Sequence, residues 1–116
     1  MEHKKESNID VSIVMAVFNE EENIEDAIES VMNQEYSNFE VIVINDGSKD
    51  STERIVNSEY EEENKVSIFS QKNKGLSSSL NRAIKISNSE FIARLDADDR
   101  CLPGRIKRLG LLVLTT

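Results

Sequence analysis

Short apolar runs rich in β-branched residues alternate with longer amphipathic stretches along this chain. Apolar runs that are bounded by polar positions are typical of buried strands. The strands that we predict cover residues 11–17, 39–45, 66–70 and 90–95. The first two, VSIVMAV and FEVIVIN, are almost continuously apolar, which favours strands covered on both faces of a sheet.

The stretches between these strands have apolar residues at helical spacing. In the first stretch, apolar residues recur three or four positions apart between Ile24 and Met32. The helices that we predict cover residues 21–34, 50–61 and 76–87. Because each crossover contains a helix, the pattern predicts an α/β fold with a mostly parallel sheet and flanking helices.

The loops that leave the strands are the places to look for function. In open parallel sheets, ligands bind outside the carboxyl ends of the strands, where the strand order reverses. These loops are all polar, and they cover residues 18–21, 46–50, 71–75 and 96–99.

Composition supports one globular domain. The chain has 116 residues, of which 38% are hydrophobic, with only four glycines and one proline. We expect residues 1–10, which include His3, to form a disordered polar tail and residues 11–116 to form the domain. The start has no apolar segment for a signal or an anchor, and the single Cys101 cannot form an internal disulfide. A cytoplasmic location is therefore expected.

Charge is distributed unevenly along the sequence. Residues 1–63 have 18 acidic and 4 basic side chains, whereas residues 64–116 have 4 acidic and 10 basic ones. Aromatic residues make up only 5% of the chain, and no basic stripe interleaves with them, which argues against nucleic acid as a partner. A small anion held near the basic half is compatible with this pattern.

Three carboxylates lie within four residues in the stretch Asp96-Ala97-Asp98-Asp99. Crowding like charges is costly unless something neutralises them. A Mg²⁺ or Mn²⁺ ion that bridges to phosphate oxygens would do so, because these ions prefer hard oxygen ligands. The alternative is a helix N-terminus with Asp99 as its cap and acids in its first turn.

Asp46 follows the second apolar run, where the chain must turn. A carboxylate there can accept a hydrogen bond from a nucleobase or from ribose hydroxyls. The alternative is a turn in which Asp46 and Ser48 satisfy local backbone donors, with Asp50 or Ser51 capping the next helix.

Two other loops are weaker candidates. Asn19 is expected to cap the first helix, with acids in the first turn, and Glu20 is the acid there best placed to contact a ligand. Asn73-Lys74-Gly75 precedes a serine-rich helix and suggests anion binding at a helix N-terminus. The spacing of a P-loop and of a dinucleotide fingerprint are both absent, and no Cys–His pair supports nucleophilic catalysis.

Taken together, the motifs resemble the family 2 glycosyltransferases. The matching stretches are VSIVMAVFNEEENIEDAIESVMNQEYSNFEVIVINDGSKDSTERIV and NKGLSSSLNRAIKISNSEFIARLDADD, followed by LPGRI. The resemblance implies the GT-A fold, which is Rossmann-like and binds nucleotide-diphosphate sugars. It also implies transfer of a sugar, with UDP-sugar as the expected donor, to a saccharide or lipid-linked acceptor in cell-envelope polysaccharide synthesis.

The resemblance assigns roles to particular residues. Ala16, Phe18, Asn19, Glu20 and Asp46 would cradle the nucleoside, with Asp46 at the uracil ring. Gly75, Asp96 and Ala97 would also contact the nucleotide. Asp96 and Asp98 would form the D-x-D pair that holds Mg²⁺ or Mn²⁺ against the diphosphate. Ala16 replaces a usual proline, and Asn45 replaces a common aspartate.

Length is the largest departure from the family. Its catalytic domains continue well past the D-x-D pair into an acceptor-binding half with the catalytic base, whereas residues 101–116 contain no Asp, Glu or His. We therefore expect a truncated, donor-binding half that is inactive in isolation and self-associates through an exposed edge. A peripheral position at the inner face of the membrane is compatible with this expectation. The alternatives are a non-catalytic nucleotide-sugar binding module and a response-regulator-type domain, which is disfavoured because no Asp ends the third strand.

Overall fold

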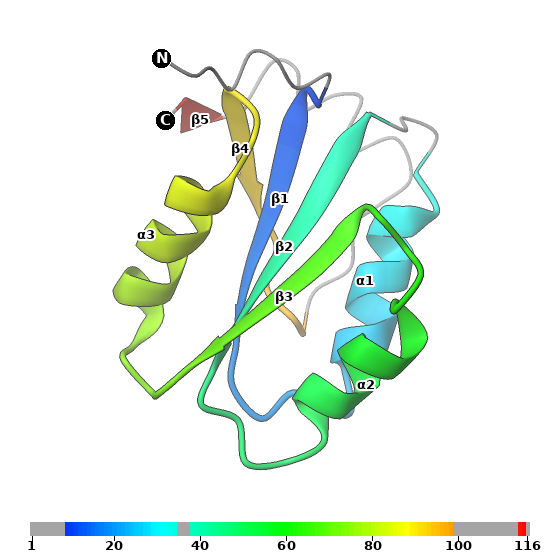
Figure 1. Cartoon of the computed structure of the whole chain (residues 1–116), viewed down its shortest axis with the longest axis vertical. Helices are drawn as coiled ribbons and strands as arrows, with labels where there is room; N and C mark the ends of the chain where they lie inside the picture. The colour runs from blue at the N-terminus through cyan, green and yellow to red at the C-terminus, as the bar shows by residue number, and fades with distance from the viewer. Residues whose placement is uncertain (1–8, 35–37, 99–113, 116) are drawn as a thin grey trace.

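The computed structural model describes residues 9–34, 38–98 and 114–115, and shows a sheet with helices on both faces (Figure 1). The strands are β1 (Val11–Val17), β2 (Phe39–Asp46), β3 (Val66–Gln71), β4 (Phe91–Arg94) and β5 (Leu114–Thr115). The helices are α1 (Ile24–Met32), α2 (Thr52–Glu59) and α3 (Leu76–Ile86). The alternation of strands and helices confirms the predicted α/β class.

The sheet has the strand order β3-β2-β1-β4-β5. Strand β1 pairs in parallel with β2 on one side and with β4 on the other, and β2 pairs in parallel with β3. The chain therefore moves outward from β1 to β3, and α3 then returns it to the far side of β1. This reversal of strand order lies beside β1, where open α/β sheets bind ligands. The carboxyl ends of β1, β2 and β3 lie toward the bottom of Figure 1.

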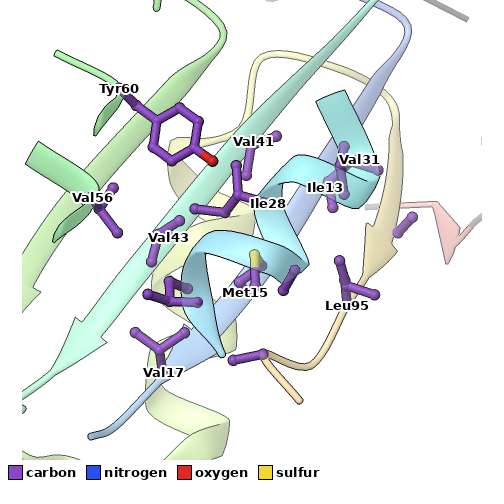
Figure 2. Packing of buried hydrophobic residues seen from close by; sticks show 14 of the residues in the cluster. Ile13, Met15, Val17, Ile28, Val31, Val41, Val43, Val56, Tyr60 and Leu95 are labelled. Carbon is purple, nitrogen blue, oxygen red and sulfur yellow. The ribbon is translucent and has the colours of Figure 1, made fainter. Parts of the chain in front are cut away.

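Two apolar layers cover the sheet. Because side chains alternate along a strand, Ile13, Met15 and Val17 of β1 face α1 and α2, whereas Val14 faces α3. Figure 2 shows α1 lying across β1 and β2, over Met15, which is fully buried. The continuous apolar runs in β1 and β2 are thus explained by helices on both faces.

Helix α1 begins later than the sequence predicted. It starts at Ile24, and Asn23 occupies its N-cap position, so the assignment of Asn19 as the cap is wrong. Asn19 has a φ of 54°, and its Oδ1 accepts a hydrogen bond from the backbone N of Lys49 at 2.8 Å. A contact with a distant loop therefore replaces the local capping that the sequence suggested.

The other boundaries shift by a few residues. Strand β2 extends to Asp46 and β3 to Gln71, whereas β4 ends at Arg94 and α2 is shorter at both ends than predicted. Strand β5 was not predicted, and it pairs antiparallel with Phe91 and Ile92 of β4. It covers part of the edge that the sequence analysis expected to be exposed.

Some expectations fall outside the described residues, namely those for the tail up to residue 8, for Asp99 as a helix cap and for Cys101. Asp10, which was assigned to the tail, donates a backbone hydrogen bond to the carbonyl of Asn38 at 3.2 Å. Among the helices that the structure describes, none is long and apolar enough to cross a membrane.

Candidate donor-binding site

A small pocket opens at the carboxyl ends of β1 and β2. It has a volume of about 110 Å³, and its lining residues are Ala16, Val17, Phe18, Asp46, Leu76 and Ser79. Phe18 and Leu76 are 45% and 50% exposed, and among the described residues they are the large hydrophobic side chains left exposed. Ligand pockets usually have volumes of about 300–1,000 Å³, so this one suits a single ring of a larger ligand.

Asp46 is the charged group in this pocket, and it is only 6% exposed. Its Oδ1 accepts hydrogen bonds from Gln71 Nε2 at 3.0 Å and from the backbone N of Lys74 at 2.7 Å. Its Oδ2 accepts one from the backbone N of Gly75 at 2.9 Å. The carboxylate thus joins β2 to the end of β3 and to the loop before α3, and its donors do not come from its own turn.

These contacts determine the ionisation of Asp46. Burial raises the pKa of its carboxyl, but the hydrogen bonds from Gln71, Lys74 and Gly75, together with the nearby Lys74 ammonium, outweigh burial and lower that pKa below its ordinary value. Asp46 is therefore an anion at neutral pH. An ionised carboxylate can only accept hydrogen bonds, so this side chain presents acceptors to the pocket.

The loops after β1 and β2 are joined side by side. The backbone N of Asn19 donates to Ser48 Oγ at 2.8 Å, and the backbone N of Glu20 donates to Thr52 Oγ1 at 2.9 Å. Glu20 Oε1 accepts from Asn23 Nδ2 at 3.2 Å, so this side chain turns toward the start of α1. Asn19 and Glu20 therefore stabilise the pocket wall and are not among its lining residues.

Asp50 is the residue that caps α2. Its Oδ1 accepts hydrogen bonds from the backbone N and the hydroxyl of Thr52, whereas Ser51, at the N-cap position, makes no side-chain capping bond. Burial raises the pKa of Asp50, but these hydrogen bonds and one from the backbone of Glu21 lower it overall. Of the two residues that the sequence suggested, Ser51 occupies the N-cap position and Asp50 accepts the side-chain hydrogen bonds at the start of the helix.

Gly75, just before the start of α3, has a backbone conformation that favours glycine. It has a φ of 97° and a ψ of 168°, which is a conformation that residues with a Cβ rarely adopt. This conformation directs its N–H at Asp46 Oδ2. The sequence analysis placed Gly75 at the nucleotide, and the structure places it at the pocket's carboxylate.

Asp96 and Asp98 lie just beyond the end of β4, on the other side of β1 from Asp46. Ala97 between them is buried, whereas Asp98 is exposed and the side chain of Asp96 is 49% exposed. Asp96 Oδ1 lies 3.0 Å from Arg94 Nε, a contact that the sequence did not reveal.

The described residues contain no group of three His, Cys, Asp or Glu side chains arranged to hold a metal ion. Mg²⁺ is commonly bound by one or two carboxylates together with phosphate oxygens and water. The donors Asp96 and Asp98 therefore fit an ion that is shared with a bound diphosphate, and they do not form a closed protein site.

The structure brings together only some of the predicted residues. Ala16, Phe18 and Asp46 line one pocket, and Gly75 joins them through a hydrogen bond. Sequence reasoning missed Gln71, Leu76 and Ser79. The sequence analysis placed Gln71 in the polar loop of residues 71–75. Its contact with Asp46 becomes apparent only from the structure, where the two residues are paired across β2 and β3.

Comparisons with known proteins show relatives of this chain in sequence and in fold. The poly-β-1,6-N-acetyl-D-glucosamine synthase of Staphylococcus aureus is 33% identical over 99 residues, which cover 82% of this chain and 24% of that protein. The structure of S. aureus TarS 1-349 in complex with UDP-GlcNAc matches with a TM-score of 0.82 and 26% identity, over 89% of this chain and 30% of the TarS 1-349 chain.

The mannosyltransferase PcManGT from Pyrobaculum calidifontis, solved in complex with GDP-Man and Mn²⁺, matches with a TM-score of 0.77 and 23% identity. The match covers 88% of this chain and 31% of the PcManGT chain, and it shows a shared fold. The chain spans about 30% of the length of several other curated relatives that it matches. The sequence profile of glycosyl transferase family 2 matches residues 12–111. The chain therefore belongs to glycosyl transferase family 2, and it has part of the GT-A fold.

Proposed function

We propose that this chain is the donor-binding part of a glycosyltransferase that uses a UDP-sugar with Mg²⁺ or Mn²⁺. The observation that carries the proposal is the pocket at the reversal of strand order, which the ionised Asp46 lines together with two exposed apolar side chains, Phe18 and Leu76. Apolar side chains beside one fixed acceptor suit a planar ring with an N–H group on its edge. Uracil has this chemistry, and it fits a pocket of about 110 Å³.

Hydrogen-bond counting leaves room for such a ring. A carboxylate has about four acceptor positions. Among the described residues, Asp46 receives two hydrogen bonds on Oδ1 and one on Oδ2. The remaining position on Oδ2 would accept the ring N–H, while Phe18 and Leu76 contact the faces of the ring.

The diphosphate would extend from this pocket toward the end of β4. Asp96 and Asp98 would hold the metal there, together with phosphate oxygens. When bound, the metal stabilises the charge that develops on the departing diphosphate. Asp96 contacts Arg94 through Oδ1, so its Oδ2 would bind the metal, and the other guanidinium nitrogens of Arg94 would donate to a phosphate oxygen.

Sugar transfer also requires a base at the acceptor hydroxyl. Residues 101–116 contain no Asp, Glu or His, and the chain spans about 30% of the length of its relatives. We therefore propose that the 116-residue chain binds donor but transfers sugar slowly or undetectably. The acceptor would be a saccharide or a lipid-linked saccharide, as in polysaccharide synthesis. We also predict that the chain self-associates at the edge of its sheet.

Calorimetric titration with UDP, dTDP and GDP, each with Mn²⁺ or with EDTA, tests donor binding. We expect UDP to bind in a Mn²⁺-dependent way and GDP to bind more weakly, because a purine exceeds the pocket. Asp98→Ala should remove the Mn²⁺ dependence, whereas Glu62→Gln, which changes an exposed acid by the same charge, should not. Equal UDP affinity in EDTA would remove the metal assignment, and equal affinity for all three nucleotides would remove the pocket assignment.

Release of UDP from UDP-N-acetylglucosamine, with and without saccharide acceptors, tests the catalytic part of the proposal. We expect no increase in release when acceptor is added. Acceptor-dependent turnover would show that these residues contain a complete active site.

A further inference from the structure

The side chain of Gln71 donates a hydrogen bond to the carboxylate of Asp46. Gln71 is the last residue of β3, and it lies directly beside Asp46, the last residue of β2, in the parallel register. Gln71 Nε2 donates to Asp46 Oδ1 at 3.0 Å and also lies 3.1 Å from Ser79 Oγ. Both of its amide hydrogens are therefore directed at residues that line the pocket.

The direction of this amide is fixed from the other side by Arg82 of α3. Arg82 Nη1 donates to Gln71 Oε1 at 3.0 Å and to the carbonyl of Ser70 at 3.3 Å. Its guanidinium also lies over the Phe69 ring, 5.8 Å from the centroid. Because a guanidinium only donates hydrogen bonds, it accepts no contact from the amide NH₂ and selects the orientation with Oε1 toward α3.

Ser79 completes the arrangement. It is fully buried, and its hydroxyl donates to the carbonyl of Gly75 at 2.9 Å, so its oxygen can accept from Gln71. Arg82, Gln71 and Asp46 thus form a directed chain of hydrogen bonds from the outer side of α3 to the pocket. Each link fixes which atom of the next residue faces inward.

We propose that Gln71 is a positioning residue for base recognition, which holds Asp46 so that Oδ2 faces the ligand as an acceptor, and that Arg82 fixes the orientation of Gln71. This inference rests on the proposed function of the pocket. A fixed acceptor favours a ring that offers an N–H at that edge, as uracil does. It disfavours cytosine, which offers a ring nitrogen lone pair at the same position.

The ratio of UDP affinity to CDP affinity measures this role, because both nucleotides have the same ribose and diphosphate. We expect the parent chain with Mn²⁺ to prefer UDP. In Gln71→Met, which keeps the length of the side chain but removes the amide, UDP affinity should fall about tenfold with little change for CDP. A merely structural weakening would lower both affinities alike.

Arg82 variants provide the rescue test and the control. Arg82→Met should lower the ratio about threefold, and Arg82→Lys, which retains a donor, should restore most of it. Lys85→Met removes an exposed cation from the same helix and should leave the ratio unchanged. Circular dichroism melting of every variant monitors folding, and the Arg82 pair decides the question if Gln71→Met does not fold.

The outcomes separate the two proposals. If the parent chain binds UDP selectively but Gln71→Met and Arg82→Met keep its UDP:CDP ratio, the positioning role is overturned and the donor pocket stands. If both nucleotides weaken equally in these variants, Gln71 is structural only, and the inference is also overturned. If the parent chain shows no preference for UDP, the proposed function itself fails, and the inference fails with it.

Discussion

Replacing Asp46 should destabilise the fold as well as the pocket, because this carboxylate joins β2 to the start of α3. Three donors bind it, namely Gln71 Nε2 and the backbone N–H groups of Lys74 and Gly75. A hydrogen bond contributes about 1 kcal/mol net, and bonds to charged groups contribute about 1.5–3 kcal/mol. Each of these three bonds should contribute about 1 kcal/mol, because Lys74 and Gly75 are exposed and their N–H groups can bind water once released.

Asp46→Ala should therefore lower the free energy of unfolding by about 3 kcal/mol. Asp46→Asn keeps the two bonds at one oxygen but places an NH₂ group against the N–H of Gly75. We expect a loss of about 2 kcal/mol for this nearly isosteric change. Glu62→Gln, which removes the same charge from an exposed position, should change stability by less than about 0.5 kcal/mol.

The pH dependence gives a second, independent signature. The pKa of Asp46 in the folded protein lies below its ordinary value of 3.8, so the carboxylate stabilises the fold above that pH. This contribution is lost as the pH falls through the folded pKa. The difference in stability between the parent chain and Asp46→Asn should therefore be largest near pH 7 and shrink below pH 3.8. Asp50 also has a lowered pKa, but it is present in both proteins and cancels in the difference.

Urea unfolding followed by circular dichroism at several pH values measures both signatures. A loss below about 1 kcal/mol for Asp46→Ala would show that the three hydrogen bonds contribute nothing net. A difference for Asp46→Asn that is the same at pH 7 and pH 3 would show that the carboxylate is not stabilised as an anion.

Two further predictions concern the backbone and a buried phenol. Gly75→Ala should lower the free energy of unfolding by about 2 kcal/mol, because an alanine there would be strained by the φ of 97°. Gly47→Ala should lower it by at least about 1 kcal/mol more, because the added Cβ would also lie 2.8 Å from the backbone N of Asn73. Equal losses for the two variants in urea unfolding would contradict this prediction. Burial and, to a smaller extent, the hydrogen bond to Glu29 raise the pKa of Tyr60. The protonated phenol therefore stabilises the fold below its ordinary pKa of 10.0, and this contribution is lost as the pH rises further. Alkaline unfolding should thus be less steep with pH in Tyr60→Phe, and identical pH profiles would refute the assignment.

The sheet could be predicted closely because its signal is local. The run at residues 11–17 is apolar at nearly every position, and β1 has those bounds in the structure. The same reasoning found β2 and β3 to within one residue at their carboxyl ends. Strand β5 escaped prediction because two residues provide no periodicity, and only pairing with β4 defines them.

The site was harder to predict because its contacts join distant segments. Asn19 has the composition of a helix cap, but its carboxamide binds the backbone of Lys49, 30 residues away. Asp46 was expected to act either on a ligand or within its own turn, and its donors lie 25 to 29 residues further along the chain. A single sequence marks such residues as polar loop positions, but only the fold shows which of them meet.

Broadening of backbone amide NMR signals by Mn²⁺, recorded with and without UDP, decides whether donor and metal share one site. We predict that UDP concentrates the broadening at residues 96–98 and extends it to the pocket residues 16–18, 46 and 76. Without UDP, the two carboxylates of Asp96 and Asp98 should hold Mn²⁺ weakly, and broadening there should be slight. Broadening that is unchanged by UDP, or that centres on the acidic helices α1 and α2, would contradict the donor-site assignment.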